Sequence, residues 1–291
     1  MFSGYSDKKN NSLHIFSDLA CERRRADLSV PGIEFKKASE SGYLWERLKI
    51  TSAEAAKSIG KPIGNYDTLT LPGLPNFDED DIEDAANEIA KELCLCIERL
   101  GINPGRLLIA GLGNRDLTPD SVGPRVAEKT NATMHIKASS PTLFDECDCS
   151  EIAVFSPGVM GTTGMESSET LTAICEKIEP DAVIAVDSLA SRSAKRLGTT
   201  IQICDTGIYP GSGIGNTRHP LTIRTLGCPV IAIGVPTVIN AHLLLKENEF
   251  INSLEFDDEY EMFVAPREID VIAEISSKII SGGINQAFGI F

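Results

Sequence analysis

The stretch of chain at 106–235 alternates short apolar runs with helical patterns, and this alternation limits the fold more than any other feature. Strand-like runs lie at Arg106–Ala110, Ile152–Phe155, Ala182–Val186 and Val230–Val235, and helical patterns lie at Pro119–Thr130 and Ser167–Ile178. Such alternation is typical of parallel strands with helices on both faces. The sequence therefore predicts an α/β protein, a three-layer αβα fold around a mostly parallel central sheet.

The segments that flank this core differ from it. From Gly32 to Leu71 short strands mix with turns, so we expect a small N-terminal subregion at 17–100. Four acids at 78–81 favour the start of a helix that runs to Leu100.

The core and a C-terminal helix are expected at 101–291. The helical spacing that begins at Pro266 predicts a helix, and Ser281-Gly-Gly283 predicts its end.

Composition narrows the class of protein. With 291 residues and 42% hydrophobic content, the chain can bury a large core. No apolar run reaches about 18 residues, and no apolar stretch follows the N-terminal lysines, so we expect a cytoplasmic protein without a membrane segment or secretion signal. The net charge of -15 argues against a nucleic-acid partner; it would attract a basic protein, although it also serves solubility.

The eight cysteines are scattered, which favours reduced thiols. Cys94 and Cys96 lie on a predicted helix, where positions two apart point in different directions, and Cys147 and Cys149 lie in an acidic loop. Neither pair has the Cys-x-x-Cys spacing of a structural zinc site, so we predict no metal bound by these cysteines.

Two acids follow predicted buried strands. Asp120 lies in the glycine-rich segment after the first strand of the core, and Asp187 directly follows Ala182–Val186. If the strands are neighbours, the acids meet in one crevice at the carboxyl edge of the sheet. A buried carboxylate is costly unless it is paired, hydrogen-bonded or protonated, so two of them indicate shared-proton chemistry or a metal site. Either reading predicts an enzyme.

Other roles for these acids remain open. Asp120 follows Thr118-Pro119, which resemble a helix cap and first helical residue, so it can simply stabilise a helix N-terminus. Asp187 is harder to explain by a structural role, because it closes a run of six mostly β-favouring apolar residues, where a carboxylate is costly. Asp181 and Asp205 are secondary candidates, and for both we favour a structural role.

The glycine-rich segments match no cofactor motif. In Gly111-Leu-Gly113-Asn114 the third glycine of a dinucleotide fingerprint is replaced by Asp116, and Gly158-Val-Met-Gly161-Thr-Thr-Gly164 lacks the lysine of a phosphate loop. We predict no cofactor. The second segment is better explained by close packing or by contact with a substrate. His219, which follows another glycine-rich loop, is expected in solvent.

The ordered motifs closely resemble the spore germination protease family of endospore-forming bacteria. The resemblance starts at Ser17-Asp-Leu-Ala20, covers nearly the whole chain, and includes Gly111–Pro124, Ser156–Gly164, Ala185–Arg192, Asp205–Gly207, Pro210–Asn216, Gly234–Thr237 and Val264–Asp270. It implies an atypical aspartic endopeptidase that degrades small acid-soluble spore proteins during germination. It also implies a homotetramer in the forespore or spore core.

In this family resemblance, the catalytic pair falls on Asp120 and Asp187. A self-processing zymogen is implied, with a propeptide at 1–16, a cleavage junction at Phe16-Ser17 and a protease domain at 17–291. Family members have Arg-Thr at the junction and alanine where this chain has Ser188, and the chain is shorter than longer members between Val238 and Met262.

We further expect backbone N–H groups of a loop to stabilise the oxyanion. The candidate residues of that loop are Gly158, Gly161, Thr162, Thr163 and Gly164.

Two other functions compete with this one. The strand-end acids and the expected sheet also resemble those of nickel-binding hydrogenase maturation proteases, which would require a third ligand such as His219 and sensitivity to chelators. A non-catalytic binder of basic spore proteins would explain the charge, but it gives the paired acids no role.

Overall fold

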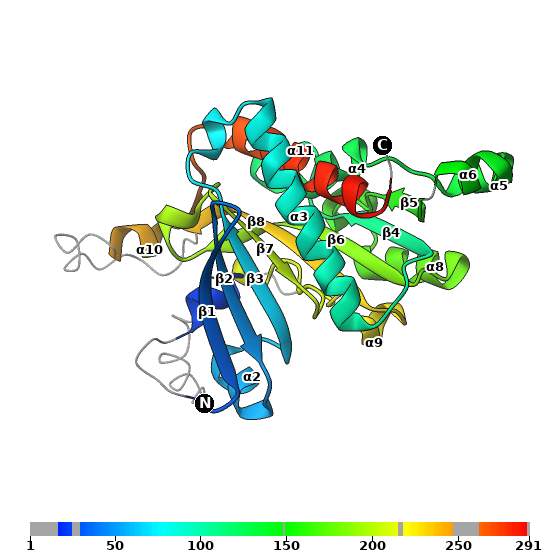
Figure 1. The fold of residues 1–291 in the computed structure, drawn as a ribbon. Coiled ribbons are helices and arrows are strands. Elements are labelled where there is room, and N and C mark those ends of the chain that lie inside the picture. The colour runs from blue at the N-terminus through cyan, green and yellow to red at the C-terminus, as the bar shows by residue number, and fades with distance from the viewer. Residues whose placement is uncertain (1–16, 25–29, 148, 215–217, 247–261, 290–291) are drawn as a thin grey trace, which may run out of the picture.

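The computed structural model describes residues 17–24, 30–147, 149–214, 218–246 and 262–289, so the predicted propeptide and Phe16 lie outside the described residues. Within these ranges a nine-stranded sheet runs in the order β1-β2-β3-β7-β8-β6-β4-β5, with β9 beside β8 (Figure 1). The strands are β1 (Ile33–Glu40), β2 (Tyr43–Ile50), β3 (Gly64–Thr70), β4 (Arg106–Gly111), β5 (Glu151–Phe155), β6 (Ala182–Ser191), β7 (Thr200–Cys204), β8 (Val230–Asn240) and β9 (Phe263–Val264).

Parallel pairing is confined to one half of the sheet. Strands β5, β4, β6 and β8 are parallel, whereas β7, β3, β2 and β1 continue the sheet in antiparallel fashion. The predicted α/β fold with parallel central strands is confirmed. The N-terminal portion extends the same sheet, because β3 pairs with β7 over Tyr66–Thr70 and Thr200–Cys204.

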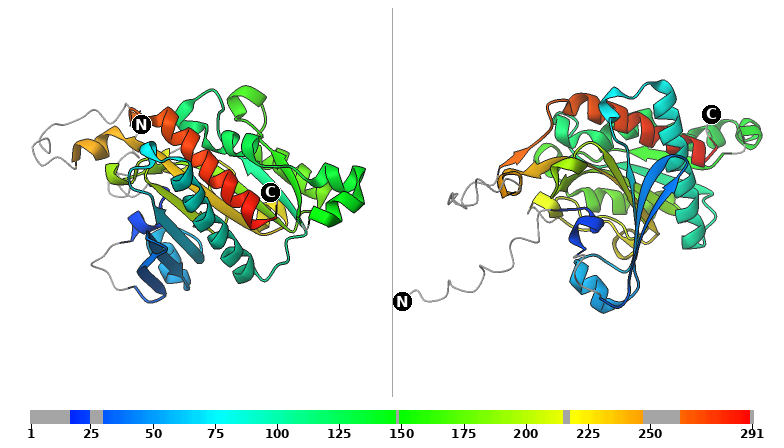
Figure 2. Two further views of the ribbon diagram at one scale, coloured as in Figure 1. Left: turned by 45° about the horizontal axis from the view of Figure 1, so that its top comes forward. Right: turned by 60° about the vertical axis from the view of Figure 1, so that its left-hand side comes forward.

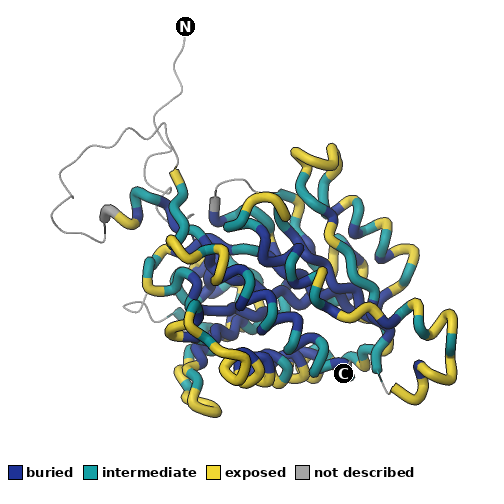
Figure 3. Tube along the Cα trace, turned by 90° about the horizontal axis from the view of Figure 1, so that it is seen from above, coloured by how far each residue is buried: buried dark blue, intermediate teal, exposed yellow. Residues whose placement is uncertain are grey.

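Helices cover both faces of the sheet and give the three layers. One apolar core joins the sheet to α3 (Glu79–Leu100), α4 (Val122–Lys129) and α11 (Ile269–Ala287). Figure 2 shows α11 lying beside α3 across this face. The opposite core includes α1 (Ala20–Arg23), α2 (Ala53–Ile59), α8 (Ser167–Ile178) and α9 (Ile223–Leu226). In Figure 3 the buried stretches of the chain gather in the interior, and exposed stretches lie at the periphery.

The remaining short elements connect the layers. They are α5 (Met134–Ser139), α6 (Pro141–Cys147), α7 (Met160–Thr163), α10 (Ala241–Lys246) and the 3₁₀ turns η2 (Leu74–Asn76), η3 (Thr118–Asp120), η4 (Ala194–Arg196) and η5 (Ser212–Ile214). None of the helices in the described ranges is long and apolar enough to cross a membrane.

The predicted start of α3 and the predicted end of α11 can be compared with the structure. The acids before α3 form a capping box, in which the Asp78 side chain accepts from Asp81 N–H and the Asp81 side chain accepts from Asp78 N–H. The predicted end of α11 at 281–283 is wrong, because the helix continues to Ala287. A Cβ at Gly283 would lie 2.7 Å from Ile89 Cβ, so this glycine allows α11 to pack closely on α3.

Strand β6 continues beyond its predicted end at Val186, which places Asp187 inside the strand. Pairing with β8 extends through a bulge between Leu189 and Ala190, because β8 also continues past Val235. Side chains alternate between the two cores, with Val186 on the α3 side and Ala185 on the α8 side. Asp187 therefore points to the same face as Ala185.

Candidate active site

The two predicted acids line the same cavity, which has a volume of about 260 Å³. Gly111 pairs with Val186 in the parallel ladder, and Leu112 N–H donates to Val186 O at 2.8 Å. The loop that carries Asp120 therefore starts beside Asp187. We call Asp120 and Asp187 the dyad, and the space that they line the dyad cavity.

Asp120 is positioned by the turn between β4 and η3. Its Oδ2 accepts from Asn114 N–H at 2.8 Å. Gly113 has φ +109°, and a Cβ there would lie 2.1 Å from the Asp120 carbonyl oxygen, so this turn needs a glycine. The N-cap of α4 is Ser121, without a side-chain capping bond. The Asp120 carboxylate thus supports the turn rather than the N-terminus of α4.

Asp187 is only 6% exposed, and its Oδ1 accepts from Ser188 N–H at 2.9 Å. Burial raises the pKa of Asp187 well above its usual range, and the negative charges of Asp120 and Asp18 raise it further. Burial also raises the pKa of Asp120, opposed by the Asn114 hydrogen bond and the positive charge of Arg218. The protonated form is therefore favoured most strongly at Asp187.

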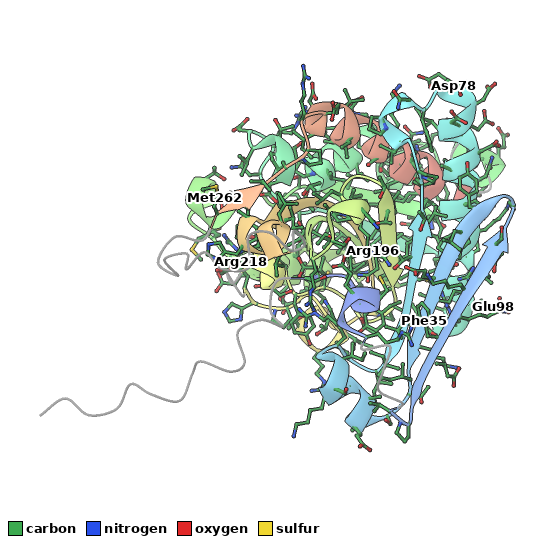
Figure 4. The ribbon with its side chains drawn as sticks, turned by 90° about the vertical axis from the view of Figure 1, so that its left-hand side faces the viewer. Phe35, Asp78, Glu98, Arg196, Arg218 and Met262 are labelled. Atoms are coloured by element: carbon green, nitrogen blue, oxygen red, sulfur yellow. The ribbon has the colours of Figure 1, made fainter. Side chains whose placement is uncertain are left out.

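Three charged residues of this cavity were missed by the sequence reasoning, namely Asp18, Glu166 and Arg218. Asp18 lies in the segment before α1, which the motif comparison used only as the start of the resemblance. Arg218, labelled in Figure 4, is half-buried on the cavity wall next to His219. An arginine beside a glycine-rich loop was the available signal for Arg218, but the reading of that loop considered the histidine alone.

Only part of the predicted oxyanion loop lies at the dyad cavity. Gly158 lines the dyad cavity. Gly161, Thr162, Thr163 and Gly164 are exposed and are not among the residues that line it. The N–H groups of Thr162 and Thr163 donate to Val159 O, at 2.9 and 3.0 Å, so these two are engaged within the turn of α7. A role in oxyanion binding stays a prediction.

At the predicted propeptide junction, Ser17 is 3% exposed and its hydroxyl donates to Glu22 Oε2 at 2.5 Å. Its neighbour Phe16 lies outside the described residues. The bond between them is therefore flanked on the C-terminal side by a residue held inside the fold.

The secondary candidates have structural contacts. Asp181 accepts from Arg106 N–H at 2.7 Å, and Asp205 accepts from Asn65 N–H at 2.8 Å. His219 lies on the wall of the dyad cavity. Among the described residues, no group of three or more His, Cys, Asp or Glu side chains is arranged to hold a metal ion.

The α/β fold brings two acids with raised pKa values to one cavity, an arrangement suited to acid–base chemistry. The sequence profile described as germination protease matches residues 14–256. The chain belongs to the germination protease family, and it is a peptidase of spore germination.

The chain is similar in sequence to curated germination proteases over most of their length. The germination protease of Caldanaerobacter subterraneus subsp. tengcongensis is 38% identical, with 94% of each chain covered. That of Clostridium perfringens is 36% identical, over 94% of this chain and 95% of the relative. That of Bacillus thuringiensis subsp. konkukian is 42% identical over 76% of this chain and 60% of the relative.

Among solved structures, the [NiFe] hydrogenase maturation protease HycI of Thermococcus kodakarensis KOD1 matches with a TM-score of 0.34. It is 18% identical, over 64% of this chain and 96% of that chain.

Proposed function

We propose that the chain is an aspartic endopeptidase in which Asp120 and Asp187 share one proton. The observation that carries the proposal is their common cavity, in which burial and the charge of Asp120 raise the pKa of Asp187. Like charges held close together ionise in two separate steps, so one acid stays protonated while its partner is ionised.

The surroundings of the two acids give them different roles. Asp120 has the Asn114 N–H and the positive charge of Arg218 to stabilise its ionised form. It serves as the general base that takes a proton from the water attacking the scissile carbonyl. Asp187, which is more deeply buried, serves as the general acid and donates its proton to the developing oxyanion or the leaving amine.

Membership of the family supports a proposal for the biological setting. The proposed substrates are small acid-soluble spore proteins, which are basic and would be attracted by a chain of net charge -15. The enzyme is made as a zymogen that removes residues 1–16 at Phe16-Ser17, acts in the forespore or spore core, and works as a homotetramer.

The test is mass mapping of digests of a small acid-soluble spore protein. Wild type, Asp120→Asn and Asp187→Asn, each processed at the propeptide, are compared with and without chelator. Asp205→Asn is the matched control, because Asp205 binds Asn65 and does not line the dyad cavity. Discrete cleavage that is lost only in the two dyad variants, and that ignores the chelator, is expected.

Two results would overturn the proposal. Full cleavage by Asp187→Asn would remove the dyad from the mechanism. Cleavage that chelator abolishes would replace the shared proton with a metal.

A further inference from the structure

The N-terminal segment also contributes a carboxylate to the dyad cavity, that of Asp18. Asp18 is 8% exposed and lines both the dyad cavity and a neighbouring space of about 30 Å³. Its Oδ2 accepts from Ala190 N–H at 2.9 Å, and its Oδ1 accepts from the Ser212 hydroxyl at 2.5 Å. Asp18 is thus attached to β6 three residues beyond Asp187.

The position of this carboxylate is fixed by its backbone as well. Asp18 N–H donates to Ala190 O at 2.9 Å, so both the main chain and the side chain bind the same residue of β6. A Cβ at Gly213 would lie 2.2 Å from Asp18 Oδ2, which shows how closely η5 covers it. The carboxylate therefore has little freedom to turn away from the cavity.

The bonds to Asp18 leave its negative charge uncompensated at short range. Its two partners, Ala190 N–H and the Ser212 hydroxyl, are neutral, and none of the ion pairs formed within the described residues includes Asp18. Arg23 and Lys61 interact with it electrostatically, but neither forms an ion pair with it. The charge can therefore act on the dyad.

Several ionisable groups face Asp187 across the cavity. They come from four elements or loops, namely Asp18, Asp120, Glu166, Arg218 and His219. Asp18 follows Asp120 as the second negative charge that raises the pKa of Asp187. Asp18 is bonded to β6, the strand that carries Asp187, whereas Asp120 lies in η3. The effect of Asp18 is therefore unequal between the two members of the dyad.

We propose that Asp18 is a positioning residue, whose fixed negative charge holds the shared proton on Asp187 and leaves Asp120 ionised. This rests on the proposed dyad mechanism and adds a further reason why the two acids do not exchange roles, beside the deeper burial of Asp187 and the Asn114 hydrogen bond to Asp120. Two equivalent carboxylates would divide the proton between them, so that only a fraction of the molecules would have the base beside the water. A charge near one of them removes that equivalence.

The test compares Asp18→Asn with Ser212→Ala. The first removes the charge but keeps an oxygen for Ala190 N–H, and the second removes a hydrogen bond to Asp18 but keeps the charge. In Asp18→Asn we expect Asp187 to lose its proton more easily, so the alkaline limb of kcat/KM shifts down by about 0.5–1 pH unit. In Ser212→Ala the limb should stay at the wild-type position.

A second readout does not depend on turnover. Carbon-13 NMR of aspartate carboxyl groups, with Asp187 assigned by comparison with Asp187→Asn, should show the same downward shift in Asp18→Asn. If Asp18→Asn does not fold, Asp18→Ser supplies a second, smaller neutral side chain for the same titration.

The proposal is overturned if a folded neutral variant leaves the titration of Asp187 unchanged, or if Ser212→Ala shifts it equally. Retained cleavage by Asp187→Asn would instead refute the dyad mechanism. The NMR titration would still report whether Asp18 acts on Asp187.

Discussion

Two pairs of neighbouring acids in the described part of the chain differ in their surroundings. In the first, Asp67 of β3 and Glu92 of α3 share two arginines. Arg47 contacts Glu92 at 2.6 Å and Asp67 at 3.4 Å, and Arg99 contacts Glu92 at 2.6 Å and Asp67 at 2.9 Å. We call these four residues the ion cluster. Their formal charges cancel.

The dyad has no comparable cations. None of the ion pairs found in the described parts of the chain includes Asp120 or Asp187, and Arg218 acts on both from beyond ion-pair distance. Burial followed by a neighbouring acid raises the pKa of Glu92 as it does that of Asp187, but two arginines bind Glu92 directly. The two pairs therefore differ in how their charge is compensated. Arginines neutralise Asp67 and Glu92, which support the fold, whereas the dyad forms no ion pair within the described residues.

The largest expected effect is on kcat, which should fall when a dyad acid is replaced and not when an acid of the ion cluster is replaced. Asp187→Asn or Asp120→Asn should lower kcat by about 10³–10⁴-fold, because each removes one half of the proton transfer. Asp67→Asn, an equally conservative change in the ion cluster, should leave kcat within a few-fold of wild type. Initial rates on a defined spore-protein peptide, with enzyme confirmed as folded by circular dichroism, measure both. Comparable loss in Asp67→Asn would break the comparison.

Stability should show the opposite order. Asp67→Asn leaves Arg99 without one of its carboxylates, at 2.9 Å in the wild type, and reduces the charge compensation of a half-buried guanidinium. We expect a loss of about 2 kcal/mol in the free energy of unfolding, the usual scale for a hydrogen bond between charged groups. Urea unfolding at one pH gives this value. A midpoint that does not move would mean that Glu92 alone holds both arginines.

The raised pKa of Asp187 should be detectable in the pH dependence of the free energy of unfolding. Because the pKa of Asp187 is raised in the folded state, its contribution to stability is complete below the pKa of the unfolded chain. That contribution is lost as the pH rises through the folded pKa. Asp187→Asn cannot ionise, so its stability relative to wild type should increase from mildly acidic to alkaline pH. Urea midpoints across that range measure the difference, and parallel curves for the two proteins would contradict it.

The sequence predicted the parts of this picture that depend on local pattern. Alternating apolar runs identified β4, β5, β6 and β8, and the two acids were found because each follows such a run. The sheet beyond β8 depends on long-range antiparallel pairing, for which single segments carry little signal.

Asp18 was missed for the same reason. Asp18 reaches the dyad cavity by bonding to Ala190, which is 172 residues away in the chain. No spacing rule connects positions so far apart in the sequence. Only the folded structure shows that Asp18 lies at the dyad cavity.

The smallest expected effect concerns hydroxyl groups near the dyad. Ser188 Oγ and Thr237 Oγ1 are buried and have no hydrogen-bond partner among the described residues. Ser188→Ala should therefore stabilise the protein by up to about 1 kcal/mol, because a buried polar group without a partner is lost. Ser191→Ala is the matched control on β6, since its hydroxyl contacts Glu22 and Ser193 O at 2.9 and 2.8 Å, and it should destabilise. Thermal unfolding decides the sign, and a loss of stability in Ser188→Ala would show that its hydroxyl does find a partner in solution.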